Sequence, residues 1–468
     1  MKPKQSQINR WPESDLIRRL CHALDIASLT IEHLAPAGYT DPHNPAASVR
    51  PEKPIAETAV LLYAAMAAAH HPEVDARLHR VARQLAPHAR SAQLQLGLAL
   101  NPGLALDYSL AHIVLGRLGY PDPAFDALLT QCRAAQASAG RERLPHRVLE
   151  QQWIESITGL SQTSAPILRH IQRRDIERTA RLSILNRPMD VLSATDDDLY
   201  AFTHALMYVT GFELSSVALP RTRVVLLAEA EAALAHCLDA QDYDLAGELL
   251  LSWPLTGRSW SPTAAFAFRV LAEVEDQAGF LPTPATRISE LDARTGASRK
   301  QYLLATAYHT AYVMGLVCAA ALQPGCAPPT TVSTRCATLG SAAQLLPLLD
   351  DCRPIPHWLE SFRRLDPLEA DALAPLLFNI ALHRHAAQHD FAALHQLLRL
   401  GHTLHLTDIP AASQAAELLE RMTLYANTLH PEAQPQEGTQ PTPGPSHPDI
   451  LHSALLNTTA STQFPTLP

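Results

Sequence analysis

The sequence predicts an all-α protein, either an irregular α/α toroid or a helical-hairpin array, with no significant β-sheet. Hydrophobic residues make up 47% of the chain and aromatic residues only 6%. Most of the apolar mass is therefore Ala and Leu, the strongest helix formers among apolar residues. Apolar positions recur at helical spacing between turns that contain Pro or Gly, and no segment shows the sustained alternation of a strand.

Capping residues and prolines mark where the first helices begin. Ser14 is placed as an N-cap, and Pro54 and Pro72 each open a helix, where a missing amide hydrogen costs nothing. Asn101-Pro-Gly and the segment 119–123 separate later helices. The helices expected in this half cover 14–35, 55–69, 72–85, 91–100, 107–118, 123–138, 143–158 and 164–184.

The second half continues the pattern around two long loops, 278–297 and 323–335. Thr195 or Asp196 is an N-cap, because acids in a first helical turn complement the helix dipole. The helices expected here cover 197–210, 221–240, 242–251, 262–277, 298–322, 336–350, 355–364, 367–388, 390–402 and 410–429.

Four segments follow from this pattern. Residues 1–13 form a flexible N-terminal tail, and 14–190 form an N-terminal helical half. Residues 191–429 form a C-terminal helical half that contains inner-ring helices. The Pro-rich text of 430–468 has almost no helical pattern, so it is expected to be disordered.

The order of the helices leaves two architectures open. A regular solenoid would show a fixed repeat and short loops, and this chain shows neither. The apolar, small-residue segments Tyr200–Thr210 and Leu303–Leu322 are typical of inner-ring helices of a toroid. Asp244–Trp253 and Ala264–Asp276 are amphipathic and are assigned as outer partners. An irregular solenoid or bundle remains the alternative.

Composition excludes several classes of protein. The net charge of −9 and the absence of a basic stripe argue against nucleic-acid binding. The seven cysteines are scattered without a CxxC pair, which indicates neither a zinc knuckle nor a disulfide framework. Neither a glycine-rich phosphate loop nor a nucleophile elbow occurs.

The same survey predicts a cytoplasmic location. The first residues lack the apolar segment of a signal peptide. Leu303–Leu322 is the most apolar run, but it carries Tyr308, His309 and Tyr312, so it is expected to be a buried helix and not a membrane span.

A motif that occurs twice supplies the candidate site. Tyr108 and His112 precede Gly119-Tyr120, and Tyr200 and His204 precede Gly211-Phe212, with the same spacing 92 residues later. Residues four apart share a helix face, so each copy presents a phenol and an imidazole to one surface. A looser third copy contains Tyr308, His309 and Tyr312.

We expect one cavity to be lined by Tyr108, His112, Tyr200, His204, His309 and Tyr312, because histidine titrates near working pH and tyrosine donates hydrogen bonds. The catalytic candidates are His204 as acid or base, Tyr200 as donor, and His309. The ligand-binding candidates are Tyr108, His112, Tyr208, Tyr312 and Asp198. In the alternative interpretation each His is a hydrogen-bonded core residue, and each Gly-aromatic pair is a helix C-cap.

Two further clusters invite a metal interpretation. Asp196–Asp198 offers carboxylates that magnesium prefers, although helix capping explains the same residues. His383–His405 is rich in histidine, and His385 and His389 share a helix face. The glutamate of an HExxH motif is missing between them, which favours a solvated helix face. No metal site and no cofactor are therefore assigned.

The region 190–325 resembles the terpenoid-cyclase and prenyltransferase toroids. The resemblance is carried by the inner-ring helices, the Gly279-Phe-Leu-Pro loop after an outer helix, and Thr195-Asp-Asp-Asp198. It implies helices arranged around a central cavity. The acid motif of the cyclases begins with an aspartate where this chain has Thr195, and no zinc-binding set is present, so their chemistry is not carried over. The whole chain also resembles hypothetical helical proteins of GC-rich bacteria.

Two functions follow as hypotheses. The first is the binding of a small apolar or amphipathic molecule in a central cavity lined by Tyr and His, with catalysis left open. The second is a non-catalytic protein–protein interaction scaffold of the α-solenoid kind, tethered by the segment 430–468. A His-based metal protein is a third, lesser hypothesis. Convergence of the Tyr/His pairs on one cavity favours the first, and dispersal favours the second.

Overall fold

The computed structural model describes residues 10–41, 44–134, 143–158, 166–212, 218–334, 338–349 and 355–429. The all-α prediction is confirmed: within these ranges the elements are helices, and the extended pairings are two isolated bridges, Arg10–Pro329 and Tyr39–Val49.

The segment 430–468, predicted to be disordered, lies outside the described residues. So does 1–9, whereas residues 10–12, also assigned to the tail, contact the fold: the Trp11 amide donates to Pro328, and the Trp11 ring packs on Phe268.

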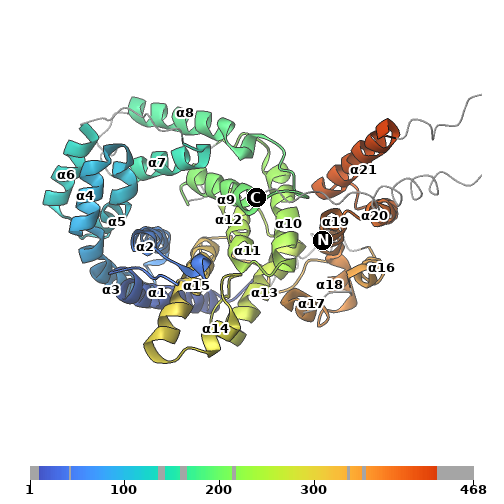
Figure 1. The fold of residues 1–468 in the computed structure, drawn as a ribbon, viewed down its shortest axis with the longest axis horizontal. Coiled ribbons are helices and arrows are strands. Elements are labelled where there is room, and N and C mark those ends of the chain that lie inside the picture. The colour runs from blue at the N-terminus through green and yellow to red at the C-terminus, as the bar shows by residue number, and fades with distance from the viewer. Residues whose placement is uncertain are drawn as a thin grey trace, which may run out of the picture.

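Six helices contact one another in a closed cycle, which we call the inner cycle (Figure 1). Each helix packs on the next one, and the last packs on the first. In order they are α2 (Glu52–Ala65), α5 (Ala105–Arg117), α7 (Pro145–Ile157), α9 (Asp196–Thr210), α11 (Tyr243–Leu250) and α15 (Gly296–Ala321). The predicted division at residue 190 falls inside this cycle, between α8 and α9, which contact each other.

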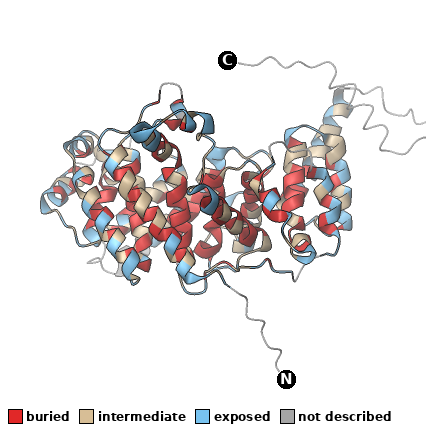
Figure 2. Ribbon diagram, turned by 90° about the horizontal axis from the view of Figure 1, so that it is seen from below, coloured by how far each residue is buried: buried red, intermediate tan, exposed pale blue. Residues whose placement is uncertain are grey.

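A second set of helices covers the outside of the inner cycle (Figure 1). The helix α1 (Glu13–Leu34) packs along α15, and α3 (Pro72–Ala89) packs on α2 and α5. The remaining outer helices are α4 (Ala92–Leu100) and α6 (Pro123–Ala134) on α5, α8 (Pro166–Leu182) on α7, and α10 (Arg223–Asp239) and α13 (Pro262–Ala278) on α11. Figure 2 shows buried residues concentrated on the helices inside this envelope.

The assignment of Asp244–Trp253 to the outer layer was wrong. The helix α11 lies in the inner cycle between α9 and α15, and every residue from Tyr243 to Leu250 is buried. Asp244 and Glu248 are four residues apart, as on a solvent-facing side of a helix. They instead accept hydrogen bonds from Tyr200 and Thr203 inside the protein. The assignments of Tyr200–Thr210 and Leu303–Leu322 to inner helices agree with the positions of α9 and α15.

A C-terminal group of helices packs against the outside of α10 and α13. The helix predicted over 367–388 is divided in two at Leu373, because Pro375 occupies the first turn of the second piece and has no amide hydrogen to donate. The group consists of α16 (Ser341–Leu345), α17 (His357–Phe362), α18 (Pro367–Ala372), α19 (Ala374–Ala387), α20 (Phe391–Thr403) and α21 (Pro410–Leu429).

Short helices complete the connections between these elements. Two are single α turns, α12 (Ser252–Thr256) and α14 (Ile288–Asp292). The others are 3₁₀ turns at Pro45–Ala47, Met66–Ala68, Pro102–Leu104, Ile184–Asn186 and Leu346–Leu349.

The expected buried helix at Leu303–Leu322 is observed in α15. Within the described ranges, α15 is the single helix long and apolar enough to cross a membrane, and 83% of its most apolar window is buried in the fold. A second candidate arises only if Ala92–Leu100 and Pro102–Arg117, which are bent by 114°, are taken together. The described residues therefore contain no clear membrane span.

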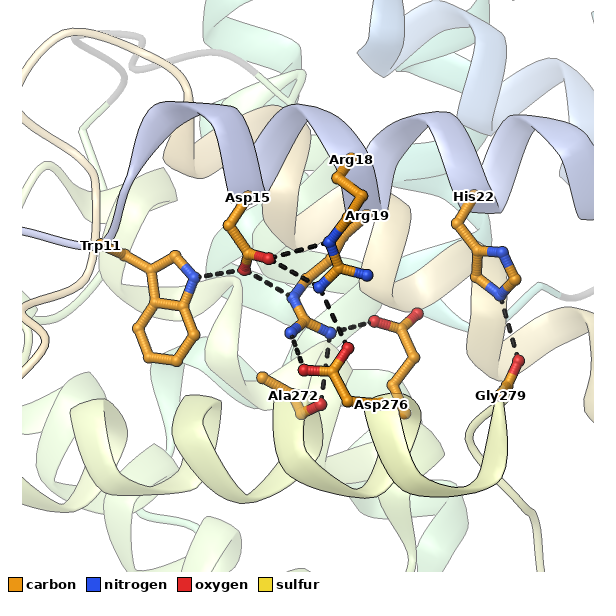
Figure 3. A network of polar contacts seen from close by, with 9 residues as sticks. Trp11, Asp15, Arg18, Arg19, His22, Ala272, Asp276 and Gly279 are labelled. Carbon is orange, nitrogen blue, oxygen red and sulfur yellow. Dashed lines mark hydrogen bonds and ion pairs between the residues drawn. The ribbon is translucent and has the colours of Figure 1, made fainter.

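A buried arginine ties the N-terminal helix α1 to α13 (Figure 3). Arg19 is 2% exposed and donates to Asp15 at 2.9 Å, to Asp276 at 2.7 Å and to the carbonyl oxygen of Ala272 at 3.2 Å. It also pairs with Glu275, which is 5% exposed. Burial would lower the pKa of Arg19, but its carboxylate partners raise it. The first helix of the chain is therefore held against the outer layer by a fully paired charge.

We expect Arg19→Met to lower the free energy of unfolding by about 3–5 kcal/mol, because it leaves Glu275 buried without its partner. Arg18→Met is the matched control: Arg18 also binds Asp15 and Asp276, but its side chain is 54% exposed. Its loss should be below about 1 kcal/mol. Urea unfolding of both variants decides the point, and equal losses would contradict a special role for Arg19.

Candidate functional site

A cavity of about 300 Å³ lies at the centre of the inner cycle, and every one of the six helices contributes side chains to its wall. The polar lining residues are Lys53, Glu57, Arg147, Glu150, His204, Tyr208, Glu248, His309 and Tyr312. The apolar lining residues are Ala56, Val60, Leu110, Met207, Phe212, Val313 and Leu316. Polar and apolar groups from distant parts of the sequence thus line one pocket.

The polar part of the wall is organised around His309 of α15. Its Nδ1 lies 3.2 Å from Oε2 of Glu57 on α2. On the other side of the ring, Nε2 lies 3.5 Å from Oδ1 of Asp244 and 3.7 Å from Oε1 of Glu248, both on α11. His204 of α9 approaches the second oxygen of Glu248, with Nδ1 at 3.5 Å. We call these five residues the acid–imidazole network.

Each carboxylate of the network accepts a hydrogen bond from a neighbouring hydroxyl. Tyr200 donates to Asp244 at 2.8 Å, and Tyr308 donates to Glu57 at 2.6 Å. Thr203 donates to Glu248 at 2.5 Å. These donors fix the carboxylates in place. On Asp244 the hydroxyl and His309 meet different oxygens. Oε2 of Glu57 faces both Tyr308 and His309, and Oε2 of Glu248 faces both Thr203 and His204.

The charges of the network are coupled. Burial would lower the pKa of His309, but the carboxylates of Asp244 and Glu57 outweigh this effect and raise it well above its ordinary value. Burial would raise the pKa of Glu57, but His309 lowers it to about 2. In the same way, His204 and His309 overcome burial and lower the pKa of Glu248. His309 is therefore an imidazolium held between ionised carboxylates.

Asp244 differs from the other two acids. Burial raises its pKa, and the nearby charge of Glu248 acts in the same direction against the opposing effect of His309. Its Oδ1 is buried without a well-formed hydrogen bond, and so is Nδ1 of His309. An uncompensated polar atom inside a protein is costly, so these two atoms mark where the network has spare hydrogen-bonding capacity.

A second ionic group borders the same cavity on α7. Arg147 pairs with Glu150 at 2.9 Å, and Tyr208 donates to Glu150 at 3.0 Å. His146, beside Arg147, packs 6.3 Å from the ring of His204. Burial and the charge of Arg147 lower the pKa of His146 to about 4, so it is a neutral neighbour of the network at pH 7.

An adjoining cavity of about 470 Å³ shares four lining residues with the first, namely Ala56, Leu110, Arg147 and Glu150. It also contains the ion pair of Arg143 and Asp107, at 3.0 Å. The two spaces therefore lie on either side of the Arg147–Glu150 pair.

Helical periodicity explains how α9 supplies its lining. Tyr200, His204, Tyr208 and Phe212 are spaced four apart, and successive rings lie 5.8, 5.9 and 6.0 Å from one another. A second close approach joins α11 to α15: a Cβ on Gly247 would lie 2.5 Å from Cγ1 of Val313. The absent side chain at Gly247 brings the neighbouring Glu248 within reach of His309.

The structure brings five of the predicted residues together. His204, Tyr208, His309 and Tyr312 line the cavity, and Tyr200 is one hydrogen bond behind it, on Asp244. Tyr312 also forms a 2.8 Å hydrogen bond with Thr58 on α2. Burial raises the pKa values of Tyr200, Tyr208 and Tyr312, so their hydroxyls remain protonated donors.

Three predicted residues lie elsewhere. His112 is 2% exposed and is held by Arg90 at 3.1 Å and Asp126 at 2.9 Å on the outer side of α5. Tyr108 packs on α4, where a Cβ on Gly97 would touch its ring at 2.8 Å. Asp198 caps α9: it exchanges hydrogen bonds with Thr195 in a capping box. The capping alternative is therefore observed for Asp198, and His112 is a hydrogen-bonded core residue whose partners are two side chains.

The C-cap interpretation of the Gly-aromatic pairs is confirmed. Gly211 has φ +63° at the end of α9, and Gly119 has φ +87° just after α5. The amides of Phe212 and Tyr120 return to carbonyl groups five residues earlier, at Met207 and Leu115.

Sequence reasoning missed the acids of the site, Glu57, Asp244 and Glu248, and the hydroxyl of Tyr308. A signal was present for two of them. Tyr243–Leu250 is apolar except at Asp244 and Glu248, which are four residues apart, and acids on a helix with no other charged position are candidates for burial. Glu57 carried no such signal, because it was expected in the first turn of a helix beginning at Ile55, where an acid is ordinary; α2 begins instead at Glu52.

No group of three or more His, Cys, Asp or Glu side chains within the described ranges is arranged to hold a metal ion. In the region 383–405, His383 is half-buried and stacks on His236 of α10 at 3.7 Å, so this histidine packs between two helices.

Stability should depend on His309 in a pH-dependent way. Its raised folded-state pKa stabilises the protein fully below the unfolded value of 6.5, and this stabilisation is lost as pH rises through the folded value. The lowered pKa of Glu57 also stabilises the folded protein. This stabilisation is fully present above the unfolded pKa of 4.5 and is lost as the pH falls through about 2. We therefore expect the stability loss caused by His309→Gln to be largest between pH 4.5 and 6.5 and to shrink on the alkaline side.

Urea unfolding at a series of pH values measures this difference. His395→Gln, at an exposed position of α20, is the matched control and should show a small loss that does not change with pH. A loss that grows toward alkaline pH would contradict a charged His309.

Comparison with known proteins identifies the family but adds no activity. No curated protein and no solved structure matches the chain significantly. Residues 21–319 match the family model of DUF6895, which is described as a domain of unknown function. The matched range begins in α1 and ends in α15, so it contains the whole inner cycle and excludes α16–α21. The chain belongs to the DUF6895 family.

Proposed function

We propose that the inner cycle is the inner ring of an α/α toroid and that its central cavity binds a small amphipathic molecule. One observation carries this proposal: all six inner helices place side chains on a single cavity of about 300 Å³. The volume is at the lower end of the range for small-molecule sites, and the lining combines apolar residues with a few convergent polar ones, as such sites do.

The acid–imidazole network supplies the chemistry that the cavity offers a ligand. His309 is a proton donor in the wall, and His204 is a second imidazole that faces the same space. Tyr200 acts through Asp244 and positions that carboxylate. A group whose pKa is strongly shifted by burial and by specific charges, in a pocket, is a candidate for function, so the proposal extends to a proton-transfer reaction on the bound molecule, with His309 as the donor.

The alternative function, an interaction scaffold, draws on a different part of the molecule. Apolar side chains are exposed on the C-terminal helices, with Leu424 61% and Tyr425 51% exposed on α21. Such residues suit contact with a protein partner. This surface lies outside the inner cycle, so a partner there is compatible with a ligand in the cavity.

We also propose that the protein is bacterial and that it is located in the cytoplasm. Five of the seven cysteines, namely Cys21, Cys132, Cys237, Cys318 and Cys326, are free and buried in the structure. Buried free thiols are typical of proteins in a reducing compartment.

A thermal-shift screen with small amphipathic alcohols, amines and carboxylic acids tests the proposal. A ligand at about 100 times its Kd should stabilise the full chain by roughly 2.7 kcal/mol. His204→Ala removes a ring from the cavity wall and should abolish the shift while the variant stays folded. His395→Ala, at an exposed histidine, should respond like the wild type. If no compound shifts the wild type, or if His204→Ala responds fully, the cavity is not the ligand site.

A further inference from the structure

The cavity lining changes from polar to apolar along α15 and α9, with Tyr208, Tyr312 and the Arg147–Glu150 pair between the two ends. On α15, His309 precedes Val313 and Leu316, and on α9, His204 precedes Met207 and Phe212. The two histidines meet through Glu248, which lies near both rings. At 1.5 Å per residue, His309 and Leu316 are separated by about 10 Å along the helix axis.

The helix α2 also places a polar residue before an apolar one along the cavity, and it contacts the other helices at both ends of the cavity. Its Glu57 meets His309 at the polar end, and Val60 lines the cavity one turn later. Beyond Val60, the ring of Tyr63 lies 6.3 Å from that of Phe212, so the apolar ends of α2 and α9 also meet. A bound molecule must therefore present a polar group to one end and an apolar group to the other.

The charges at the polar end decide which polar group fits. Three carboxylates, Glu57, Asp244 and Glu248, gather around the single ring of His309. Two of these, Glu57 and Glu248, line the cavity, and Glu248 is only 3% exposed. Asp244, which is 8% exposed, adds an oxygen without a well-formed hydrogen bond just behind them.

The other basic side chains of the lining add little charge beside these acids. Arg147 is engaged by Glu150 at 2.9 Å. The side chain of Lys53 is 58% exposed, and its Nζ lies 3.7 Å from Glu57, so solvent weakens its contribution. By formal charge, the three carboxylates exceed the imidazolium of His309 and the exposed ammonium of Lys53 by one.

We propose that the ligand is an organic amine, bound as its ammonium ion beside Glu57 and Glu248, with an apolar tail that extends toward Val313, Leu316 and Phe212. This assignment rests on the ligand-binding function proposed above and names its chemical class. An ammonium donates three hydrogen bonds and attracts both carboxylates. A carboxylate or phosphate ligand would be repelled by them. A neutral alcohol would gain hydrogen bonds without the attraction between charges.

Three compounds of equal length separate these possibilities: hexylammonium, hexan-1-ol and hexanoate. Calorimetric titration of the full chain at one pH and ionic strength should give hexylammonium at least about tenfold tighter binding than hexanol, and no binding of hexanoate. Replacing butylammonium with hexylammonium should tighten binding by roughly fourfold for each added methylene, since the tail is buried.

Two variants test the placement of the head group. Glu248→Gln should weaken hexylammonium at least about tenfold and leave hexanol within about threefold of the wild type. Glu57→Gln repeats the test from α2 in case the first variant is unstable. Glu417→Gln, on an exposed position of α21, is the matched control and should change neither ligand.

The outcomes distinguish the two proposals. If the compounds bind but hexanol or hexanoate equals hexylammonium, or if Glu248→Gln and Glu57→Gln weaken all compounds alike, the amine assignment is wrong and the cavity remains a ligand site. If neither these compounds nor any member of the thermal-shift screen binds the wild type, the ligand-binding function itself is wrong.

Discussion

The charge of His309 is the constraint on which the centre of this protein depends. Glu57, Asp244 and Glu248 come from two helices on opposite sides of the imidazole, and among the described residues no buried lysine or arginine pairs with any of them. Without a proton on His309, three carboxylates, two of them buried, would face one another at the centre of the inner cycle, and such an arrangement is costly. The same cation that stabilises the fold therefore also lines the cavity, which joins stability and chemistry in one residue.

The inner cycle delivers these groups because its helices approach one another closely. Gly247 allows α11 to reach α15, and a Cβ on Gly315 would lie 2.6 Å from Cβ of Ala23 on α1, on another side of α15. The helix α15 is thus enclosed by α1, α2 and α11, which fixes His309 between Glu57 and Glu248. Outside, Arg19 holds α1 to α13 and so completes the packing around α15.

The sequence predicted most of the helices, because these depend on local residues. The starts expected at Ser14 and Pro54 were wrong: α1 begins at Glu13 after Pro12, and α2 begins at Glu52 after Pro51. Thr195 and Gly211 begin and end α9 as expected, and α9 and α15 were correctly assigned to the inside. The candidate site was predicted only in part. The two copies of the Tyr/His motif have the same helical face, but His204 meets Glu248 across the cavity whereas His112 meets Arg90 and Asp126. Spacing predicts which side chains share a face, and the partner of that face depends on tertiary packing. For the same reason, the acids of α11 predicted a solvent-facing side of the helix, because the contact between α11 and α15 is not encoded in the local sequence.

The most direct test of this account is the protonation state of the His309 ring, measured by NMR. Ring nitrogen and carbon shifts of the labelled full chain, assigned by the signal lost in His309→Gln, report whether the imidazole is charged. The account predicts that this histidine stays an imidazolium at pH values well above the ordinary 6.5 and titrates only on the alkaline side. A neutral His309 ring at pH 7, or a titration midpoint at or below 6.5, would contradict it.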